Sequence, residues 1–390
     1  MHNYYKYLFL CLSILFCSCK QGKTQIYAKP LPVAVDTVSN IILGEPKNGV
    51  IVLNDSIDLK NRICVLQPGI KLLFKGGVIK NGALQGNGTK LESEKPCFDR
   101  VNIWGTWDVP TIKSSLFCDL SYDNALKDVV ALSDSTVKNK IIIDKGEYYV
   151  TAYKNGDVCI PVYSNTELVM NGTIRLTPNE YTNYYIIQAE GNNIIIKGKG
   201  AIVGDKHTHT DKKGEWGMGI NLDRAHHVTI KGLTVRDCWG DCIYVGGESS
   251  DVMIENCLLD NGRRQGISIT SADGVTIKNC TITNVGGTAP EYGIDVEPNK
   301  DETVDNVSIR NVKVSDCRGG ILAWGGAPNA HIGNLEIRNC TISKTSKLPI
   351  SIIKCKSAKV ENCITMGFSW KKDINVVETG TVVLKNNKKR

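Results

Sequence analysis

Phenylalanine, proline and long apolar runs are scarce in this 390-residue chain. It has 6 Phe and 12 Pro against 37 Gly, and strand-forming residues dominate. Only one segment has a convincing amphipathic helical pattern. The net charge of +7 is mild, and no concentrated basic stripe with interleaved aromatic residues is present. The composition therefore predicts a chain built mainly of strands and argues against nucleic acid as a partner.

What the chain does contain is a repeat of about two dozen residues that returns from Val228 to the C-terminus. Each copy is an alternating strand, a turn residue that tolerates the left-handed region, and a second strand. The six turn residues, separated by 24, 23, 32, 28 and 23 positions, are Gly232, Asn256, Asn279, Asn311, Asn339 and Asn362. Stacked copies bury a continuous core that no single copy could bury. The pattern predicts an all-β solenoid, a right-handed parallel β-helix, with the asparagines stacked at one bend.

The residue after each turn is expected to point into the core of this solenoid. These residues are Leu233, Cys257, Cys280, Val312, Cys340 and Cys363. Stacked core thiols behave as small hydrophobic groups, so we expect these four cysteines to be buried and reduced. Cys238 and Cys242 flank a turn and are the best candidates for a disulfide. No Cys-x-x-Cys pair with zinc spacing occurs among the 15 cysteines.

Each repeat also contains a third strand with the pattern Gly-Ile-x-apolar. If the isoleucines point inward, the period of two sends one column of polar residues outward, namely Asn221, Tyr244, Ser268 and Asp295. A second outward column holds Asp223, Gly246, Thr270 and Glu297. Short polar, acidic and aromatic side chains are typical of sugar-binding surfaces. Further expected substrate-binding residues, from neighbouring loops and a later copy, are Asp241, Arg263, Arg264 and Trp324.

Before the repeats come a Gly-punctuated β segment and a short helical pattern. Residues 71–88 have short strands broken by turn dipeptides, which predicts a small β module or narrow first coils. Apolar residues at helical spacing over 119–132 are followed by a strand and Gly146-Glu-Tyr148. This order resembles the opening of β-helices of the pectate-lyase superfamily, where the helix caps the first coil. A cap is required because an open end would expose core and unpaired strand edges.

The resemblance gives an expected domain organisation and an expected function. The expected segments are a signal peptide (1–19), a tether (20–40), a small Gly-rich β module (41–112) and the β-helix (113–390). The resemblance implies a polysaccharide-active enzyme, with a glycoside hydrolase first. A polysaccharide lyase or epimerase acting on uronates is the first alternative, and a non-catalytic glycan-binding protein is the second.

The segment Tyr292-Gly-Ile-Asp295-Val-Glu297 is the sharpest catalytic motif. Its two carboxylates, two residues apart on one strand, are ~7 Å apart by strand rise, which matches an inverting acid/base pair with water between them. Arg264 from the preceding coil could keep one acid ionised. The segment also resembles the Tyr-Gly-x-Asp-x-His strand of β-helical alginate epimerases, with Glu297 at the histidine position, and Tyr292 would then assist proton abstraction. A solvated strand face or a cation site such as calcium is the plain alternative.

The first nineteen residues have the pattern of a signal peptide. Lys6 precedes an apolar run from Leu8 to Phe16 that is too short to span a bilayer, and the run leads into Cys17-Ser-Cys19. This end resembles a bacterial lipobox, so Cys19 is the expected lipidation site, with an ordinary signal peptide as the alternative. The expected location is the bacterial cell envelope, on the periplasmic or outer-membrane face, with a membrane partner through the lipid anchor.

The His207-Thr-His209 segment invites a metal interpretation. No third ligand is specified by the sequence, so a polar loop overhanging the third strands is the preferred interpretation. We therefore assign no metal site and no cofactor.

Overall fold

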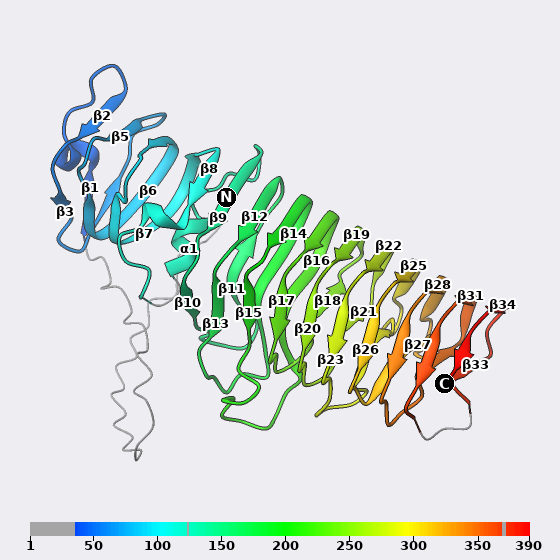
Figure 1. Cartoon of the computed structure of the whole chain (residues 1–390). Coiled ribbons are helices and arrows are strands. Elements are labelled where there is room, and N and C mark those ends of the chain that lie inside the picture. Colours follow the sequence, from blue (N-terminus) through cyan, green and yellow to red (C-terminus); the bar gives the residue numbers. More distant parts are fainter. Residues whose placement is uncertain (1–35, 123–124, 369–371) are drawn as a thin grey trace, which may run out of the picture.

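The computed structural model describes residues 36–122, 125–368 and 372–390. Within them the chain winds into a solenoid of stacked coils, with nearly every ordered segment a strand (Figure 1). Every pairing between named strands is parallel, so each coil hydrogen-bonds to the coil before it and the coil after it. The predicted all-β parallel β-helix is confirmed.

A seven-stranded sheet forms the N-terminal end of the molecule. Its strands are β1 (Asp36–Ser39), β2 (Val50–Leu53), β3 (Ile57–Asp58), β4 (Arg62–Val65), β5 (Lys71–Phe74), β6 (Ile79–Glu92) and β7 (Phe98–Asp108). A 3-10 helix, η1 (Asn40–Leu43), follows β1. Glycine is required where these coils touch, because a Cβ on Gly86 would lie 2.5 Å from the Trp107 ring. These narrow coils continue the stack at its blue end (Figure 1).

The second sheet has ten strands and forms one side of the main solenoid. They are β10 (Glu147–Val150), β13 (Thr173–Leu176), β15 (Ala201–Val203), β17 (Thr234–Arg236), β20 (Leu258–Asp260), β23 (Thr281–Thr283), β26 (Lys313–Ser315), β29 (Thr341–Ser343), β32 (Ile364–Met366) and β35 (Lys388–Lys389). We call this side the second-strand face, because its later members are the second strands of the predicted repeats.

The third sheet has eighteen strands and covers two sides. One side, called the site face below, holds β11 (Asp157–Val162), the first halves of β14 (Asn183–Gly198) and β16 (Trp216–Lys231), β18 (Ile243–Gly246), β21 (Ile267–Ile269), β24 (Tyr292–Val296), β27 (Gly319–Trp324), β30 (Ile350–Ile353) and β33 (Ile374–Val377). The other side holds β8 (Thr111–Lys113), β9 (Asn139–Ile143), β12 (Thr166–Met170), the second halves of β14 and β16, β19 (Ser249–Glu255), β22 (Ala272–Lys278), β25 (Thr303–Arg310), β28 (His331–Arg338), β31 (Cys355–Glu361) and β34 (Thr381–Lys385). Long β14 and β16 bend from one side to the other and join them.

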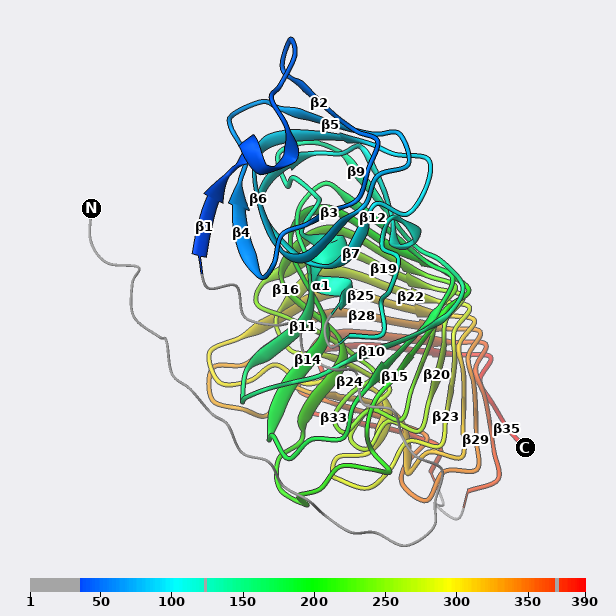
Figure 2. The same cartoon turned by 90° about the vertical axis from the view of Figure 1, so that its left-hand side faces the viewer.

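The predicted helix exists but is shorter than its apolar pattern. Among the described residues of 119–132, which leave out 123 and 124, the helical ones are those of α1 (Ala125–Val130), and a 3-10 turn, η2 (Ser114–Leu116), precedes them. The helix contacts β7, β8, β10 and β11, and in the view along the solenoid it lies over the interior of the coils (Figure 2). It therefore covers the first wide coil, while the narrow N-terminal coils stack beyond it.

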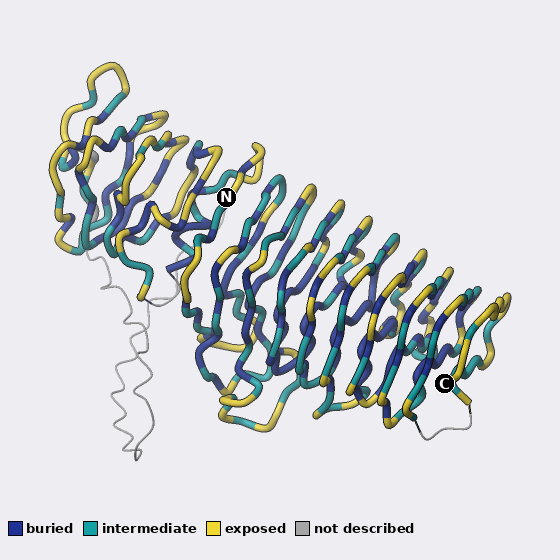
Figure 3. The backbone as a smooth tube through the Cα atoms, in the orientation of Figure 1, coloured by how far each residue is buried: buried dark blue, intermediate teal, exposed yellow. Residues whose placement is uncertain are grey.

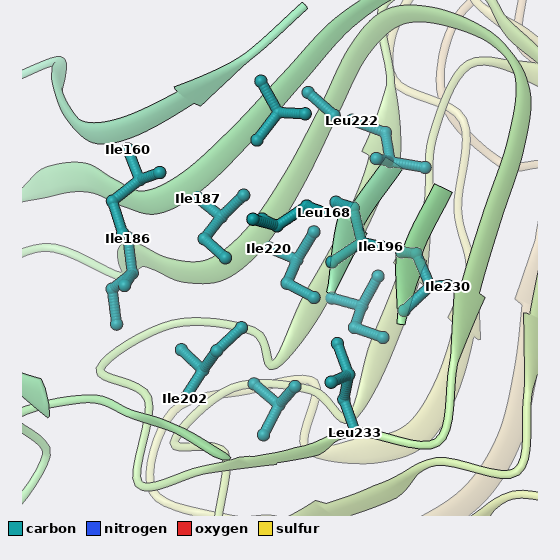
Figure 4. Close-up of a cluster of buried hydrophobic side chains, with 14 of the residues drawn as sticks. Ile160, Leu168, Ile186, Ile187, Ile196, Ile202, Ile220, Leu222, Ile230 and Leu233 are labelled. Atoms are coloured by element: carbon teal, nitrogen blue, oxygen red, sulfur yellow. The ribbon is translucent and has the colours of Figure 1, made fainter. Parts of the chain in front are cut away.

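Buried residues recur at matching positions of successive coils (Figure 3), and their apolar side chains form the core. Ile220, Ile243, Ile267 and Ile294 are aligned in register and fully buried, as predicted. Isoleucine and leucine fill the upstream coils in the same way (Figure 4). Burying one such side chain is worth about 1.5–3 kcal/mol, so the stack itself holds the site face rigid.

The predicted asparagine bend is confirmed, although its amides face outward. Asn256, Asn279, Asn311, Asn339 and Asn362 all have φ of 54–56°. Asn311 Nδ2 donates to Asn279 Oδ1 at 3.1 Å, and Asn339 Nδ2 donates to Asn311 Oδ1 at 3.3 Å. Asparagine recurs here because it tolerates the left-handed region, and because its side-chain amide can hydrogen-bond to the asparagine of the preceding repeat.

The stacked cysteines are buried as predicted. Cys257, Cys280, Cys340 and Cys363 are at most 3% exposed and are free thiols. Their Sγ atoms donate to backbone carbonyls of the same bend, as Cys257 does to Glu255 at 3.3 Å. Cys238 and Cys242, the proposed disulfide pair, are also free thiols.

Within the described residues, none of the helices is both long enough and apolar enough to cross a membrane. The expected signal peptide, with Cys19 and most of the tether, lies outside the described residues.

Candidate functional site

The register of the site face brings the first predicted polar column together. Asn221 pairs with Tyr244, Tyr244 with Ser268, and Ser268 with Asp295. The column then turns apolar at Leu322 of β27. Asp295 therefore lies at the boundary between a polar and an apolar stretch of the face, one strand spacing (~4.8 Å) from Leu322.

The second predicted column runs beside the first and ends on an aromatic ring. Asp223 pairs with Gly246, and the pairing of Ile269 with Val296 sets Thr270 beside Glu297. The pairing of Val296 with Ala323 then sets Glu297 beside Trp324, which is partly exposed. An aromatic ring one coil from a carboxylate pair gives a flat surface on which a sugar ring can stack.

Asp295 faces outward but is not solvated, which the sequence did not predict. It is only 1% exposed. Gln265 Nε2 donates to Asp295 Oδ2 at 2.7 Å, whereas Asp295 Oδ1 is buried without a hydrogen-bond partner. An unpartnered buried carboxylate oxygen is costly, so its presence here marks a position that a ligand or a proton can satisfy.

Glu297 acts on Asp295 through its charge. Burial raises the pKa of Asp295 well above its ordinary value, and the neighbouring carboxyl group of Glu297 raises this pKa further. The inverting pair of Asp295 and Glu297, with a water between the two carboxyl groups, stays a prediction.

A third carboxylate, Asp241, completes the cluster from the loop before β18. It is fully buried and forms an ion pair with Arg264, with Nη1 of Arg264 3.1 Å from Oδ2. Ser268 Oγ donates to the same oxygen at 2.7 Å, while Asp241 Oδ1 has no partner. The negative charge of Asp241 adds to the shift of the Asp295 pKa. Arg264 therefore pairs directly with Asp241, and its charge also acts to lower the pKa of Asp295.

Gln265, which the sequence analysis missed, holds Tyr292 and Asp295 together. Its Oε1 accepts from the Tyr292 backbone N–H at 2.7 Å, while its Nε2 donates to Asp295. Gln265 is fully buried and immediately precedes the Gly-Ile strand, a position that could have drawn attention to it. Burial and the Asp295 charge raise the pKa of Tyr292 to about 12, so its phenol stays protonated near neutral pH.

The remaining predicted binding residues of the face hydrogen-bond within it. Asn221 Nδ2 donates to Gln188 at 3.3 Å, and the Tyr244 hydroxyl is 2.8 Å from that of Thr270. Asp223 lies on the exposed side of the column and forms an ion pair with Arg224 at 2.7 Å. These residues line the approach to the Asp295 cluster from the upstream coils.

Arg263 packs against the loop before β16. Its guanidinium stacks 3.7 Å above the Trp239 ring and donates to the Gly214 carbonyl at 2.7 Å. On the same ring, His209 is stacked at a centroid distance of 3.9 Å. His209 Nδ1 is 2.8 Å from Asp205 Oδ2, inside the fold. Arg263 thus fastens this loop, and its contact with substrate stays a prediction.

His207 and His209 do not converge on a common point. His207 Nε2 lies 3.2 Å from Asp237 and 2.8 Å from Asn261 Nδ2, on the surface. Over the part of the chain that the structure describes, no group of three or more His, Cys, Asp or Glu side chains has the arrangement of a metal site.

Comparison with known families identifies the solenoid. Residues 139–306 match the family model described as "Right handed beta helix region". The chain is 34% identical over 203 residues to an uncharacterized protein, YclG, of Bacillus subtilis (strain 168). That match covers 43% of this chain and 34% of YclG, so the chain spans about a third of this relative's length.

Solved structures of similar shape share little sequence with the chain. A protein described as Geobacillus virus E2 ORF18 has a TM-score of 0.47 and 15% identity, over 72% of this chain and 60% of its own. An iota-carrageenase in complex with iota-carrageenan fragments has a TM-score of 0.41 and 15% identity, over 66% and 57%. The family model and the parallel strand register together lead to one conclusion: the chain is a right-handed parallel β-helix protein.

Proposed function

We propose that this protein hydrolyses glycosidic bonds of a polysaccharide bound along the site face. The observation that carries the proposal is the state of Asp295, a buried carboxyl group with a raised pKa and one unpartnered oxygen. A carboxylic acid that keeps its proton near neutral pH can protonate the leaving oxygen of a sugar.

In the proposed reaction, two carboxyl groups divide the work. Asp295 donates its proton to the glycosidic oxygen as the bond to the anomeric carbon breaks. Asp241, held by Arg264 and Ser268, accepts a proton from the water that attacks that carbon. One water is consumed, and a second proton transfer through solvent restores both groups.

This pairing replaces Glu297 by Asp241 as the base and leaves inversion as the expected outcome. Asp241 and Asp295 come from coils two apart, and Ser268, on the coil between them, donates to Asp241. An inverting reaction needs a water between the two carboxyl groups, and we propose that this water binds between Asp241 and Asp295. Glu297 then acts on Asp295, keeping its proton in place, while Trp324 supports the neighbouring sugar.

The lyase alternative has less support from this arrangement. A lyase needs a base to abstract a proton beside a uronate carboxyl group, and Tyr292 was the predicted participant. Burial and the charge of Asp295 raise the pKa of Tyr292 to about 12, so its phenol gives up a proton less readily than an ordinary tyrosine.

The test compares Asp295→Asn and Glu297→Gln with the unchanged chain on a panel of polysaccharides. New reducing ends should appear with the unchanged chain, fall at least about a hundredfold with Asp295→Asn, and fall less with Glu297→Gln. Asp273→Asn, on the neighbouring side of the solenoid in register with Asp305, is the matched control and should retain full activity. Product with an unsaturated uronate would move the reaction to the lyases. Full activity of both site variants would end the catalytic proposal, and binding without cleavage would favour a glycan-binding protein.

We also propose that Cys19 carries a lipid that anchors the protein in a bacterial envelope. The support is the short apolar run from Leu8 to Phe16 followed by the lipobox-like Cys17-Ser-Cys19. Cys19→Ser should prevent labelling by radioactive palmitate and release the protein from the membrane fraction. Unchanged labelling of this variant would rule out Cys19 as the site.

A further inference from the structure

We infer that the site face selects a polysaccharide without carboxylate or sulfate groups along its bound stretch. The inference rests on the proposed function of the Asp295 cluster, and it names the chemical class of the substrate. It follows from how the charges of this face are distributed and paired.

The site face and the loop before β18 carry five acidic side chains. In order along the solenoid they are Glu190, Asp223, Asp241, Asp295 and Glu297. Asp241 Oδ1 and Asp295 Oδ1 are buried without partners. Asp241, the base of the proposed reaction, can only accept hydrogen bonds when ionised, so its Oδ1 favours sugar hydroxyls, which donate, over anions.

The arginines of the face are already neutralised by these acids. Arg264 pairs with Asp241 at 3.1 Å and lies 3.7 Å from Glu215. Arg224 pairs with Asp223 at 2.7 Å and with Glu190 at 3.1 Å. Each arginine faces two carboxylates, so an acidic sugar would have to compete with both for the guanidinium.

The cations of the adjacent loops are engaged as well. Arg263 donates to the carbonyls of Gly214 and Lys212 and stacks on Trp239. Lys206 donates to Asn261 Oδ1 at 2.6 Å and to the Gly286 carbonyl at 3.0 Å. Arg318 and Lys347 share Glu291.

Lys212 and Lys213 of the same loop are exposed, and the structure gives their ammonium groups no partner. They extend from the loop that Arg263 fastens. They are therefore the residues on which an acidic polymer would depend, and the experiment includes them.

A polyanion would meet this face at a double disadvantage. Its own charges would approach the acidic side chains of the face, and like charges repel most strongly at reduced dielectric. It would also lose water without gaining a free cation in exchange. An uncharged glycan meets neither difficulty, and the acceptors and Trp324 suit its hydroxyls and ring faces. The acidic side chains of the face thus weaken binding of a polyanion, while their oxygen atoms accept hydrogen bonds from an uncharged glycan.

Binding of matched polymers tests the inference separately from catalysis. Full-length Asp295→Asn protein is run by affinity electrophoresis through gels with polygalacturonate or alginate, each beside its carboxyl-reduced form, and through gels with uncharged glucan, mannan and xylan. We expect retention by at least one uncharged or carboxyl-reduced polymer, and at least about tenfold weaker retention by every polyuronate. The double variant Glu190→Gln/Asp223→Asn should reduce the difference in retention between the uncharged polymers and the polyuronates.

The outcomes separate the two proposals. Stronger retention by a polyuronate than by its reduced form, lost in Lys212→Gln/Lys213→Gln, would overturn the inference, and so would retention by no uncharged polymer. Retention by an uncharged polymer that the unchanged protein does not cleave would overturn the hydrolase proposal and leave the selectivity standing. Hydrolysis of a polyuronate into shorter chains would overturn the inferred selectivity and leave the hydrolase proposal standing.

Discussion

Asp128 of α1 should make the junction at the first coil sensitive to pH. Its Oδ1 accepts from the Ile103 N–H of β7 at 2.7 Å, and its Oδ2 accepts from the Tyr122 hydroxyl at 3.0 Å. Burial raises the pKa of Asp128 from 3.8 to about 7. The carboxyl group thus ties the helix to the N-terminal sheet while holding its proton more tightly when folded than when unfolded.

The sign and size of the effect follow from this difference. Below about pH 4 both states are protonated, and above pH 7 both are ionised. Between those values only the unfolded state loses its proton, so the free energy of unfolding falls as pH rises. The shift from 3.8 to about 7 corresponds to roughly 4 kcal/mol, at ~1.4 kcal/mol for each pH unit. Asp128→Asn keeps the shape and the Ile103 contact but does not titrate.

Native-state hydrogen exchange is the suitable assay, because solenoids open locally. In the unchanged chain, the free energy of opening for peptides covering β7 and α1 should fall by about 4 kcal/mol between pH 4 and pH 8. In Asp128→Asn it should stay nearly level, and peptides from β28 to β32 should behave alike in both proteins. Equal pH dependence of β7 and α1 in the two proteins would refute the reasoning.

Three further predictions concern the bend, the cluster and the core. Asn311→Ala should lower the free energy of unfolding by about 1–2 kcal/mol, because alanine is strained at φ 54° and the amide bonds to Asn279 and Asn339 are lost; Asn311→Gly should cost less in urea unfolding, and equal costs would contradict the argument. Asp295→Asn should leave the melting temperature unchanged or higher, since Asn has the shape of a protonated carboxyl group and cannot ionise at this buried position, and a large drop by calorimetry would show that Asp295 is mainly structural. In thiol titration of the native protein, four buried cysteines should stay unlabelled until the protein unfolds, namely Cys257, Cys280, Cys340 and Cys363. Ready labelling of these cysteines in the native protein would contradict their burial.

Much of the architecture could be predicted because its signals are local and repeated. The Gly-Ile-x-apolar strands fix which side chains face inward, and a parallel register then aligns them. Asn221, Tyr244, Ser268 and Asp295 could therefore be placed in one column from sequence alone. The apolar pattern over 119–132 extends past the end of α1 (Ala125–Val130), because such a pattern marks the buried side of a segment and not where its helix ends.

The details of the site could not be predicted, because they depend on loops of unequal length. Alternation shows that Asp295 points away from the core, but not that Gln265 covers it. Two arginines stand side by side in the sequence, yet Arg264 enters the carboxylate cluster while Arg263 stacks on Trp239. Their different roles depend on where the loop over residues 205–216 lies.

The sequence by itself determined the repeat, the direction of each side chain and the residues at the left-handed bend, since these follow from strand periodicity and backbone sterics. Only the tertiary structure decided the distances between charges and their solvation. Asp241, Asp295 and Glu297 come from two coils separated by a third, and stacking brings their charges within interaction range. Burial, set by loops from still other coils, then decides which of them holds a proton, because desolvation depends on the whole surroundings of a group and not on its neighbours in the chain.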